Sequence, residues 1–394
     1  MSNSELPLVS VIIPAYHAEA FIEDTLNSVL SQTYKNIEVV VVDDGSQDRT
    51  AAIVRAIIQQ DARVFLFQQS NAGVAAARNL GIQKSRGEYI APIDADDIWY
   101  PQNLEKQVRC LLEAGPSVGV VYSWSLDIDE KGSLTGGFYT SDIEGDVYTA
   151  LLYKYFLGNA SSTLIRKACF DKVGGYNCKL KEQNAQGCED RELYLRIAEF
   201  YQFRVVPEFL VGYRQIGNSM SCNDALMAKS HLLLLAEAQH RHPEIPAGIY
   251  QSSTSNFYLY LARQSSRGGK HASALNWLYQ ALQLDFIRTI LDHNLYILSI
   301  QNLLKLIAQA GTSLVLPERP SRLQFKQQFN SDQRGMTLGD VTRRMNIHKY
   351  LPAQLYERSQ LKKLSKSPEK LKGVSPQTVK PKTLEASLPP SAEG

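Results

Sequence analysis

Residues 87–101 of the chain read GEYIAPIDADDIWYP, and the rest of the sequence is arranged around this stretch. An apolar run leads into three carboxylates, Asp94, Asp96 and Asp97, and an aromatic residue and a proline follow them. Carboxylates this close repel one another, so the cluster costs free energy unless a cation or hydrogen-bond donors offset the repulsion. Proteins often hold Mg²⁺ or Mn²⁺ with one or two carboxylates together with the phosphates of a substrate. The stretch therefore indicates a divalent metal site, and the alternative is a solvated acidic turn that caps the next helix.

The composition is that of an ordinary globular protein. The 394 residues are 44% hydrophobic and 21% charged, and this length suits about two domains. A net charge of +2 gives no reason to expect nucleic acid as a partner. The five cysteines include no CxxC pair, so we expect reduced, structural thiols in a cytoplasmic protein. Residues 1–8 lack the pattern of a signal peptide and no apolar run of about 18 residues occurs, so we predict neither a signal peptide nor a transmembrane helix.

Strand and helix patterns alternate through the first part of the chain. Four apolar runs read as strands, at residues 8–14, 36–42, 63–67 and 89–93. Runs that are apolar on both faces are typical of parallel strands covered by helices. Polar residues gather where these runs end, and the carboxyl ends of parallel strands are where such sheets bind ligands. The pattern therefore predicts an α/β domain with its ligand site at this edge of the sheet.

The later part of the chain changes character. Residues 127–146 are polar and Gly-rich and read as a long loop or hairpin, and residues 203–206 and 209–214 read as two late strands. Beyond them the pattern is helical, and residues 255–288 have the spacing of a tetratricopeptide-like helical hairpin with its turn at residues 268–269. One such hairpin cannot bury its own apolar face, so we expect it to pack on other helices or on the α/β domain.

Residues 294–310 predict an amphipathic helix. Lys305 is its only basic residue, so the apolar face favours packing within the protein over contact with a membrane. Residues 359–394 are rich in Lys, Pro and Ser and read as a disordered tail. The predicted organisation is an α/β domain, a helical extension and a poorly ordered basic, Pro-rich segment, at residues 7–224, 225–316 and 317–394 respectively.

Five segments together resemble the family 2 glycosyltransferases of the GT-A fold, at residues 9–16, 40–46, 71–79, 87–97 and 189–197. The resemblance covers roughly residues 7–220, and its motifs follow the family's order along the chain. It implies a nucleotide-sugar transferase domain with a mainly parallel central sheet flanked by helices. It also implies transfer of a sugar from a nucleotide diphosphate to an acceptor hydroxyl, with inversion at the anomeric carbon.

The resemblance implies a donor site made of residues that follow several strands: Pro14, Ala15, Tyr16, Glu19, Asp44, Asn71, Gly73, Arg78, Asp94, Ala95, Asp96 and Glu189. Tyr16 would stack on the base, although a lone Tyr in a turn is more often a packing residue. Asp44 would accept a hydrogen bond from a ring N–H of the base, and uracil has such a donor, so we expect a UDP-sugar. Gly73 permits close approach of the backbone, and Arg78 would reach a phosphate or ribose unless it lies on a solvated helix face. Glu19 would be a donor contact or only a favourable acid in the first turn of a helix.

The metal site implied by the resemblance is the DxD motif of Asp94 and Asp96. Asp96 would be the main ligand to Mg²⁺ or Mn²⁺, and Asp94 would lie toward the sugar or ribose. The ion would stabilise the charge that grows on the diphosphate leaving group. Asp97 would support these two residues or act as a helix N-cap.

The expected general base is Asp190. Inversion in a single displacement needs a carboxylate to take the proton of the acceptor hydroxyl. Glu189 and Asp190 match the family's acidic pair at a helix start, although acids are common there for other reasons. Glu189 would orient the acceptor or Asp190. The family often carries a His after a Tyr-Arg pair such as residues 213–214, but Ile216 stands nearby, so we assign no His ligand.

The function predicted is sugar transfer in the assembly of a cell-surface polysaccharide or glycoconjugate, with a saccharide, lipid-linked or protein acceptor. We expect the protein in the cytoplasm, where peripheral contact with the inner face of the membrane is compatible with this role. One alternative is an inactive relative whose helical half is an interaction module. Against it, the chain retains all four expected acidic residues, Asp44, Asp94, Asp96 and Asp190. The other is a nucleotidyltransferase, which would need a Gly-rich basic loop that residues 14–19 lack.

Overall fold

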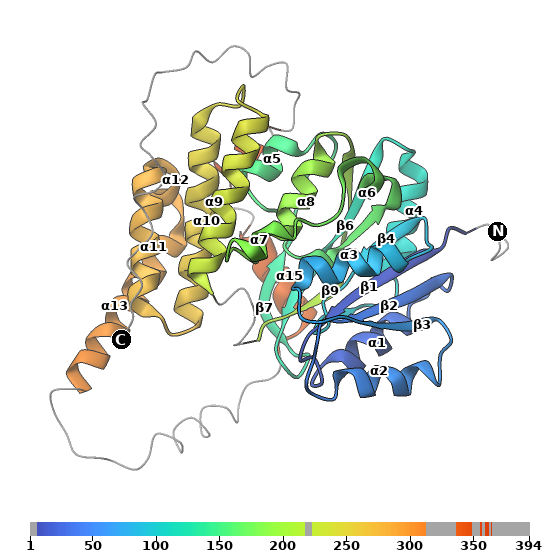
Figure 1. Ribbon diagram of the computed structural model, residues 1–394. Helices are drawn as coiled ribbons and strands as arrows, with labels where there is room; N and C mark the ends of the chain where they lie inside the picture. The colour runs from blue at the N-terminus through green and yellow to red at the C-terminus, as the bar shows by residue number, and fades with distance from the viewer. Residues whose placement is uncertain are drawn as a thin grey trace.

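The protein consists of an α/β domain and a helical region packed beside it (Figure 1). The computed structural model describes residues 6–216, 223–312 and 336–348, together with residues 355–356, 359–361 and 364. Within these residues one mixed sheet of nine strands has the order β3-β2-β1-β4-β8-β6-β9-β5, and β7 pairs with β6.

The first half of the sheet is parallel, as predicted. Its strands are β1 (Val9–Ala15), β2 (Ile37–Asp43), β3 (Val64–Gln68) and β4 (Tyr89–Pro92), and the helices between them are α1 (Ile22–Leu30), α2 (Thr50–Ile58) and α3 (Val74–Lys84). Every residue of β1 and β2 is buried. Alternate residues of each strand belong to two different hydrophobic clusters, because successive side chains of a strand point to opposite faces. Figure 1 shows α1 and α2 on one face of the sheet and α3 on the other.

The second half of the sheet mixes parallel and antiparallel pairs. Its elements are β5 (Ile98–Trp99), α4 (Asn103–Ala114), β6 (Val118–Ile128), β7 (Leu134–Tyr139), α5 (Tyr148–Tyr153), the 3₁₀ turn η1 (Ala160–Ser162), β8 (Thr163–Arg166), α6 (Lys167–Val173), α7 (Lys179–Glu182), α8 (Glu189–Ala198) and β9 (Gln202–Arg214). Strand β8 runs antiparallel to both β4 and β6, whereas β9 is parallel to β6. The predicted long loop contains a hairpin, since β7 pairs antiparallel with β6.

The two late strands predicted from the sequence are one strand. In β9, Val206 pairs with Ser123 of β6 and Phe209 pairs with the next residue, Trp124. Pro207 and Glu208 therefore have no partner in β6, and the strand passes them as a bulge. Pro207 has no backbone N–H to donate to a neighbouring strand. Because it lies in the bulge, no such hydrogen bond is required, and the strand continues.

The helical region contains the predicted hairpin. Its elements are α9 (Asp224–Arg241), α10 (Ala247–Arg267), α11 (His271–Leu284), α12 (Phe286–Leu291) and α13 (His293–Thr312). Helices α10 and α11 form the hairpin, and Gly269 lies in its turn at a φ of 74°, where glycine is favoured. As expected, the hairpin packs on α9, α13 and the α5 helix of the α/β domain. Its assignment as a tetratricopeptide-like repeat stays a prediction.

A buried arginine joins the two regions. Arg191 of α8 donates hydrogen bonds to the carbonyl oxygen of Leu152 at 2.8 Å and to Ser253 Oγ at 3.0 Å, and its guanidinium lies 3.1 Å from His231 Nδ1. Asn256 of α10 donates to the carbonyl oxygen of Tyr153 at 2.8 Å. These contacts fix α10 beside the start of α8.

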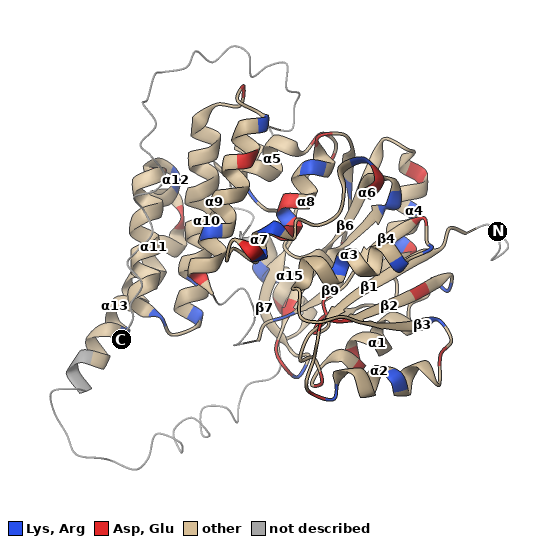
Figure 2. Cartoon of the chain, viewed as in Figure 1, with Lys and Arg blue, Asp and Glu red and all other residues tan. Residues whose placement is uncertain are grey.

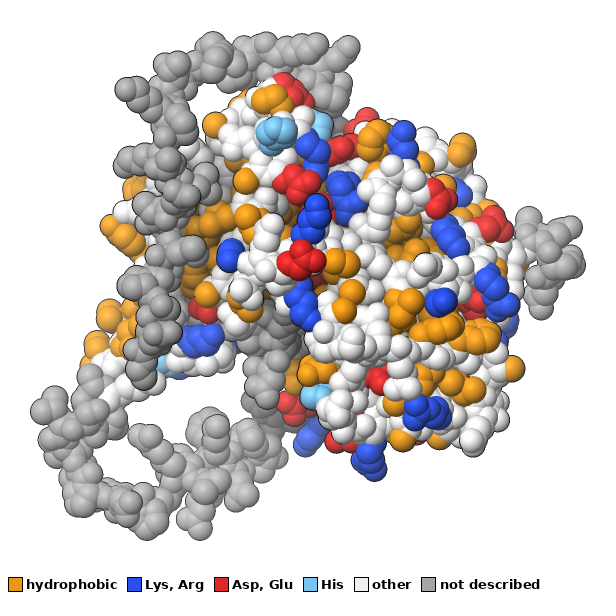
Figure 3. Space-filling model, viewed as in Figure 1, with side chains coloured by type: hydrophobic (Ala, Val, Ile, Leu, Met, Phe, Trp, Pro, Cys, Tyr) orange, Lys and Arg blue, Asp and Glu red, His pale blue; other side chains and the backbone are white. Residues whose placement is uncertain are grey.

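The predicted interior packing of α13 is wrong for its outer half. Leu303, Leu304 and Ile307 are 53%, 61% and 59% exposed, whereas Leu295 and Leu298 pack against the core. Figure 3 shows hydrophobic side chains at the surface of the helical region, where α13 lies. The reason is geometric, because the hairpin covers only one side of the helix. Within the described ranges, no helix combines the length and hydropathy that a membrane crossing requires.

Part of the segment expected to be poorly ordered is described. Helix α15 (Leu338–His348) lies against β7. Most of the remaining residues of 317–394 lie outside the described ones, including nearly all of the predicted tail. The boundaries 7–224, 225–316 and 317–394 stay predictions, and α9 begins at Asp224.

Candidate active site

A cleft of about 1500 Å³ opens where the parallel strands end. Loops that follow β1, β2 and β4 form one side, and the start of α8 lies deeper. Helix α10 and residues of α15 complete the wall. All but one of the predicted site residues line this cleft: Pro14, Ala15, Tyr16, Asp44, Asn71, Gly73, Arg78, Asp94, Ala95, Asp96, Glu189 and Asp190. The structure therefore brings together residues that are up to 176 positions apart (190 − 14).

Glu19 is the exception. Its carboxylate accepts hydrogen bonds from the backbone N–H of Arg49 at 3.0 Å and from the Arg49 side chain at 3.2 Å. Helix α1 begins only at Ile22, so Glu19 is not in its first turn either. Because Glu19 is absent from the residues that line the cleft, we no longer assign it to the donor site.

The acidic loop after β4 is tied down at Asp97. The fully buried Asp97 carboxylate accepts from Ser161 Oγ at 2.5 Å and from the Arg214 N–H at 2.8 Å. The Arg214 side chain also donates to the carbonyl oxygen of Asp96 at 2.6 Å. Helix α4 begins at Asn103, so Asp97 is not a helix N-cap; it holds the loop in place.

Asp94 is held by a buried cation. Arg78 of α3 donates to Asp94 Oδ1 at 2.6 Å and to Glu189 Oε1 at 2.9 Å. Its guanidinium also lies 5.2 Å from the centre of the Tyr176 ring. The Arg78 side chain is 4% exposed, so the solvated helix face that was its alternative is excluded. One arginine thus connects the acidic loop to the first residue of α8.

Asp96 fits a metal ligand better than its neighbours do. Burial and the nearby Asp94 carboxylate raise the pKa of Asp96 to about 7. No other described residue donates a hydrogen bond to its carboxylate, and the residue lines the cleft. The described residues contain no cluster of three or more His, Cys, Asp or Glu side chains arranged to hold a metal. An ion at Asp94 and Asp96 would need further ligands, such as phosphate oxygens of a substrate, and this metal site stays a prediction.

Asp190 lies at the start of α8, and one of its carboxylate oxygens accepts a hydrogen bond from a tyrosine. Its Oδ2 accepts from the Tyr155 hydroxyl at 2.6 Å, and its Oδ1 accepts from the N–H of Arg191 at 2.6 Å. Burial and the adjacent Glu189 carboxylate raise the pKa of Asp190 to about 6, and the Tyr155 hydrogen bond opposes this rise. A carboxylate with a pKa near neutral is suited to accept a proton.

Asp44 shapes the loop that precedes α3. It accepts from the N–H groups of Ala72 and Gly73, both at 2.8 Å, and from Gln69 Nε2 at 2.7 Å. Gly73 has a φ of 92°, and a side chain there would collide with Lys181. Lys181 in turn donates to Asn71 Oδ1 at 2.7 Å. A carboxylate has about four acceptor positions, so Asp44 retains room for a further donor.

Tyr16 is open to a ligand. Its ring is 52% exposed, lies in the cleft wall and stacks on His17 with the ring centres 4.1 Å apart. An exposed ring has a free face, so the packing alternative is not supported here. Pro14 and Ala15 continue the wall behind it.

Comparison with known proteins places this cleft in a family. The model for glycosyl transferase family 2 matches residues 10–174. Over 238 residues the chain is 42% identical to the "Putative teichuronic acid biosynthesis glycosyltransferase TuaG" of Bacillus subtilis. The match covers 60% of this chain and 90% of TuaG. The chain belongs to glycosyltransferase family 2. An uncharacterized glycosyltransferase of Methanocaldococcus jannaschii is 30% identical over 218 residues, or 54% of this chain and 73% of that protein. The match to an uncharacterized Haemophilus influenzae glycosyltransferase, 44% identical over 109 residues, covers only 44% of that protein.

Solved structures confirm the predicted GT-A fold. S. aureus TarS residues 1–349 in complex with UDP-GlcNAc matches with a TM-score of 0.51 at 16% identity, covering 75% of this chain and 88% of TarS. Pyrobaculum calidifontis mannosyltransferase PcManGT, in complex with GDP-Man and Mn²⁺, matches with a TM-score of 0.51 at 22% identity, covering 79% of this chain and 88% of that one. At these identities the likeness concerns the fold alone.

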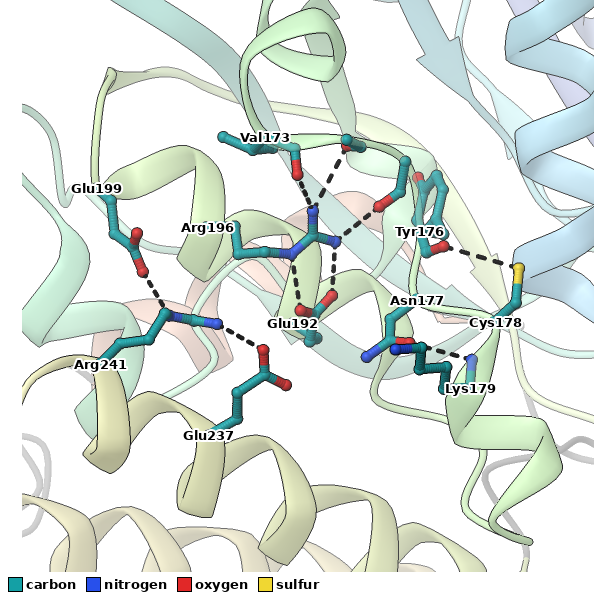
Figure 4. Close-up of polar contacts among 12 residues, drawn as sticks. Val173, Tyr176, Asn177, Cys178, Lys179, Glu192, Arg196, Glu199, Glu237 and Arg241 are labelled. Atoms are coloured by element: carbon teal, nitrogen blue, oxygen red, sulfur yellow. Dashed lines mark hydrogen bonds and ion pairs between the residues drawn. The ribbon is translucent and has the colours of Figure 1, made fainter.

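Ion pairs hold the helix that carries Asp190 in this glycosyltransferase. Arg196 of α8 forms a two-pronged pair with Glu192 and donates to the carbonyl oxygen of Val173 at 2.6 Å (Figure 4). Arg241 of α9 pairs with Glu199 at 3.0 Å, just beyond the end of α8. Figure 2 shows how acidic and basic residues gather on α7 and α8. The helix is thereby fixed both to the preceding loop and to the helical region.

The sequence did not indicate several residues of this site. Tyr155 contacts Asp190, and Ser161 accepts from the N–H of Asp94 at 3.0 Å while donating to Asp97. Neither residue lies in a recognisable motif. The Arg214 contacts could have been inferred from the Tyr-Arg pair that ends β9. The contribution of α10 to the cleft wall had no sequence signal.

Proposed function

We propose that this glycosyltransferase moves a sugar from a UDP-sugar to an acceptor hydroxyl, with inversion, and that Asp190 is the general base. One observation carries the proposal. Arg78 joins Asp94 to Glu189, so the acidic loop and the helix that starts at Asp190 face the same cleft. A donor bound at the loop and an acceptor bound at α8 would meet there.

The proposed reaction is one displacement. The acceptor oxygen forms a bond to the anomeric carbon of the donor, and the bond from that carbon to the diphosphate oxygen breaks. The acceptor proton passes to the Asp190 carboxylate, and the nucleoside diphosphate leaves. The pKa of about 6 keeps Asp190 mostly ionised at pH 7, while leaving it basic enough to take the proton. Tyr155 holds the carboxylate in place by its hydrogen bond.

Asp96 and Asp94 would hold Mg²⁺ or Mn²⁺ in this enzyme. Such an ion, when bound, offsets the negative charge that develops on the diphosphate. The Mn²⁺ complex of PcManGT, a protein of the same fold, supports this assignment. Arg78 holds Asp94 in place, and Asp96 is left without a competing partner in the described structure.

Uracil is the base that we propose for the donor nucleotide. Tyr16 offers an exposed ring for stacking, and Asp44 beside it can accept a hydrogen bond from a ring N–H. The TarS complex contains UDP-GlcNAc and the PcManGT complex contains GDP-Man, so both nucleotides belong in a test. The relation to TuaG supports a role in polysaccharide assembly, with a saccharide, lipid-linked or protein acceptor.

The test is calorimetry with UDP, GDP and their sugars, with and without Mn²⁺. We expect UDP to bind more tightly with Mn²⁺ to the wild-type protein, and Asp96→Ala to remove the Mn²⁺-dependent part. The control is Glu19→Ala, which removes a carboxylate outside the cleft and should keep the Mn²⁺-dependent part of the UDP affinity. Equal UDP affinity with and without Mn²⁺ in the wild type would contradict the proposal. Tighter binding of GDP than of UDP would show that the base of the donor is guanine and not uracil.

A further inference from the structure

Three arginines line the part of the cleft that the helical region contributes. Arg263 and Arg267 lie one turn apart on α10, and Arg344 comes from α15. Figure 2 shows basic residues on α10. Arg344 lies over β7, since a side chain at Gly136 would collide with its Nη1 atom. The three guanidinium groups therefore reach one region, between α10 and the hairpin of β6 and β7.

Few carboxylates balance this charge. Arg267 Nη2 lies 4.0 Å from Asp127 Oδ2. Among the described residues, neither Arg263 nor Arg344 has an ion-pair partner within that distance. Asp292 lies near Arg263 but is shared with Arg288 and with the N–H of Asn294. Asp127 is the carboxylate beside Arg267, Asp292 lies near Arg263 and Asp340 lies near Arg344, but among the described residues none of the three arginines forms an ion pair closer than 4.0 Å.

The buried carboxylate of Asp127 lacks part of its hydrogen bonding within the described residues. Its side chain is 4% exposed, and its Oδ1 has no hydrogen-bond partner among the described residues. Burial raises its pKa to about 6, and Arg267 only partly opposes this rise. The contact between Asp127 and Arg267 is loose at 4.0 Å, and guanidinium groups are the side chains best shaped to bind phosphate or carboxylate with two hydrogen bonds.

Helix α10 links this region to the reaction centre. Asn256, Tyr260, Arg263 and Arg267 all line the cleft and recur at helical spacing, so they share one face. Asn256 binds the carbonyl oxygen of Tyr153, two residues before the Tyr155 that holds Asp190. The seven residues from Asn256 to Arg263 rise about 10 Å along the helix. A ligand lying along this face would extend from Asp190 to the arginines.

We infer that Arg263, Arg267 and Arg344 bind a phosphate or carboxylate group of the acceptor, at a distance from the reacting hydroxyl. The inference rests on the proposed function, because it takes the cleft beside Asp190 as the acceptor site. The proposed ligands of the donor diphosphate come from a different element, since Asp94 and Asp96 follow β4 whereas the arginines come from α10 and α15.

The experiment compares three probes that share one aryl glycoside and differ in the group at C6, which is a neutral hydroxymethyl, a carboxylate or a phosphate: 4-nitrophenyl β-glucoside, 4-nitrophenyl β-glucuronide and 4-nitrophenyl β-glucoside 6-phosphate. Their binding to the full-length protein is measured by calorimetry with saturating UDP and Mn²⁺, which occupy the donor site. UDP binding is recorded first, so a failed donor site is distinguished from a failed anion site. We expect the anionic probes to bind about tenfold or more tightly than the glucoside, the effect of a charge-assisted hydrogen bond. The two anionic probes then distinguish carboxylate from phosphate.

Two variants act in opposite directions. Arg263→Gln with Arg267→Gln should remove most of the preference for the anionic probes and leave UDP affinity unchanged. Asp127→Asn removes the carboxylate beside Arg267 and should increase the preference. Lys229→Gln with Lys305→Gln is the matched control, because it removes two cations of the helical region that do not line the cleft. Equal binding of charged and neutral probes, no binding of the anionic probes, or a preference that the arginine variant retains would overturn the inference.

Discussion

Arg78 shares its guanidinium between two carboxylates inside the protein, Asp94 at 2.6 Å and Glu189 at 2.9 Å. Nearly complete burial disfavours any charge, but these two partners keep the pKa of Arg78 well above its usual value. A buried ion pair of this kind is weak support for stability when intact, whereas removing one partner leaves uncompensated buried charge. Arg78 is therefore a residue on which both the loop and the start of α8 depend.

Arg78→Gln should destabilise the fold by roughly 3–5 kcal/mol, because it leaves Asp94 and Glu189 without their cation. Arg49→Gln is the control, since Arg49 is 81% exposed and its pair with Glu19 contributes about 0–1 kcal/mol. Urea unfolding of the two variants measures the difference. Similar midpoints for both would show that Arg78 is not a structural link.

Asp190 and Tyr155 give the transfer reaction a specific pH dependence. The raised pKa means that Asp190 becomes protonated below about pH 6, and a protonated carboxyl group cannot act as the base. The transfer rate should therefore fall as the pH drops through about 6. Tyr155→Phe removes a hydrogen bond that stabilises the ionised form, so it should move this inflection to higher pH. Tyr148→Phe, whose ring lies against His242 instead, should not move it. An inflection that stays in place in Tyr155→Phe would contradict the role given to this tyrosine.

At the scale of elements, the strands that deliver the site were predictable. The runs at β1, β2 and β4 are apolar on both faces because helices cover both sides, and that gives an unambiguous signal. Helix α5 has only six residues and no periodic pattern, so it was missed, and with it the setting of Tyr155. The continuity of β9 was also missed, because a proline usually ends a strand and only the bulge opposite β6 lets this one pass.

Helix α13 shows where an amphipathic pattern is not sufficient. The pattern gives an apolar face but does not say whether another element covers that face. Leu304→Glu should change the free energy of unfolding by no more than about 0.5 kcal/mol, as for an ordinary surface site. Leu278→Ala, at a buried position of α11, should cost about 2–5 kcal/mol. Chemical denaturation of the two variants tests this, and a large loss in Leu304→Glu would mean that the outer face of α13 is covered in solution.

At the scale of the whole molecule, the cleft is built from both regions of the chain. Most of the residues predicted for the donor site belong to local motifs near the strand ends, and the structure places them in this cleft. Arg263, Arg267 and Tyr260 were not predicted, since their place in the wall depends on how α10 packs against α8, through Arg191 and Asn256. Such long-range packing leaves no local pattern in a single sequence. The motifs therefore predict the residues after the strands and the acidic pair at the start of α8, whereas only the fold reveals what α10 contributes to the cleft.

Asp190→Asn tests most directly the proposal that Asp190 acts on the acceptor and not on the bound UDP. The variant keeps the size of the side chain but cannot accept the acceptor proton. UDP affinity with Mn²⁺ is measured by calorimetry, and transfer is measured to whichever acceptor the wild-type enzyme uses. We expect UDP affinity near that of the wild type and a transfer rate lower by about 10²–10⁴-fold, the usual contribution of a general base. Transfer at more than about a tenth of the wild-type rate, or a collapse of UDP affinity, would contradict the assignment of Asp190 as the base.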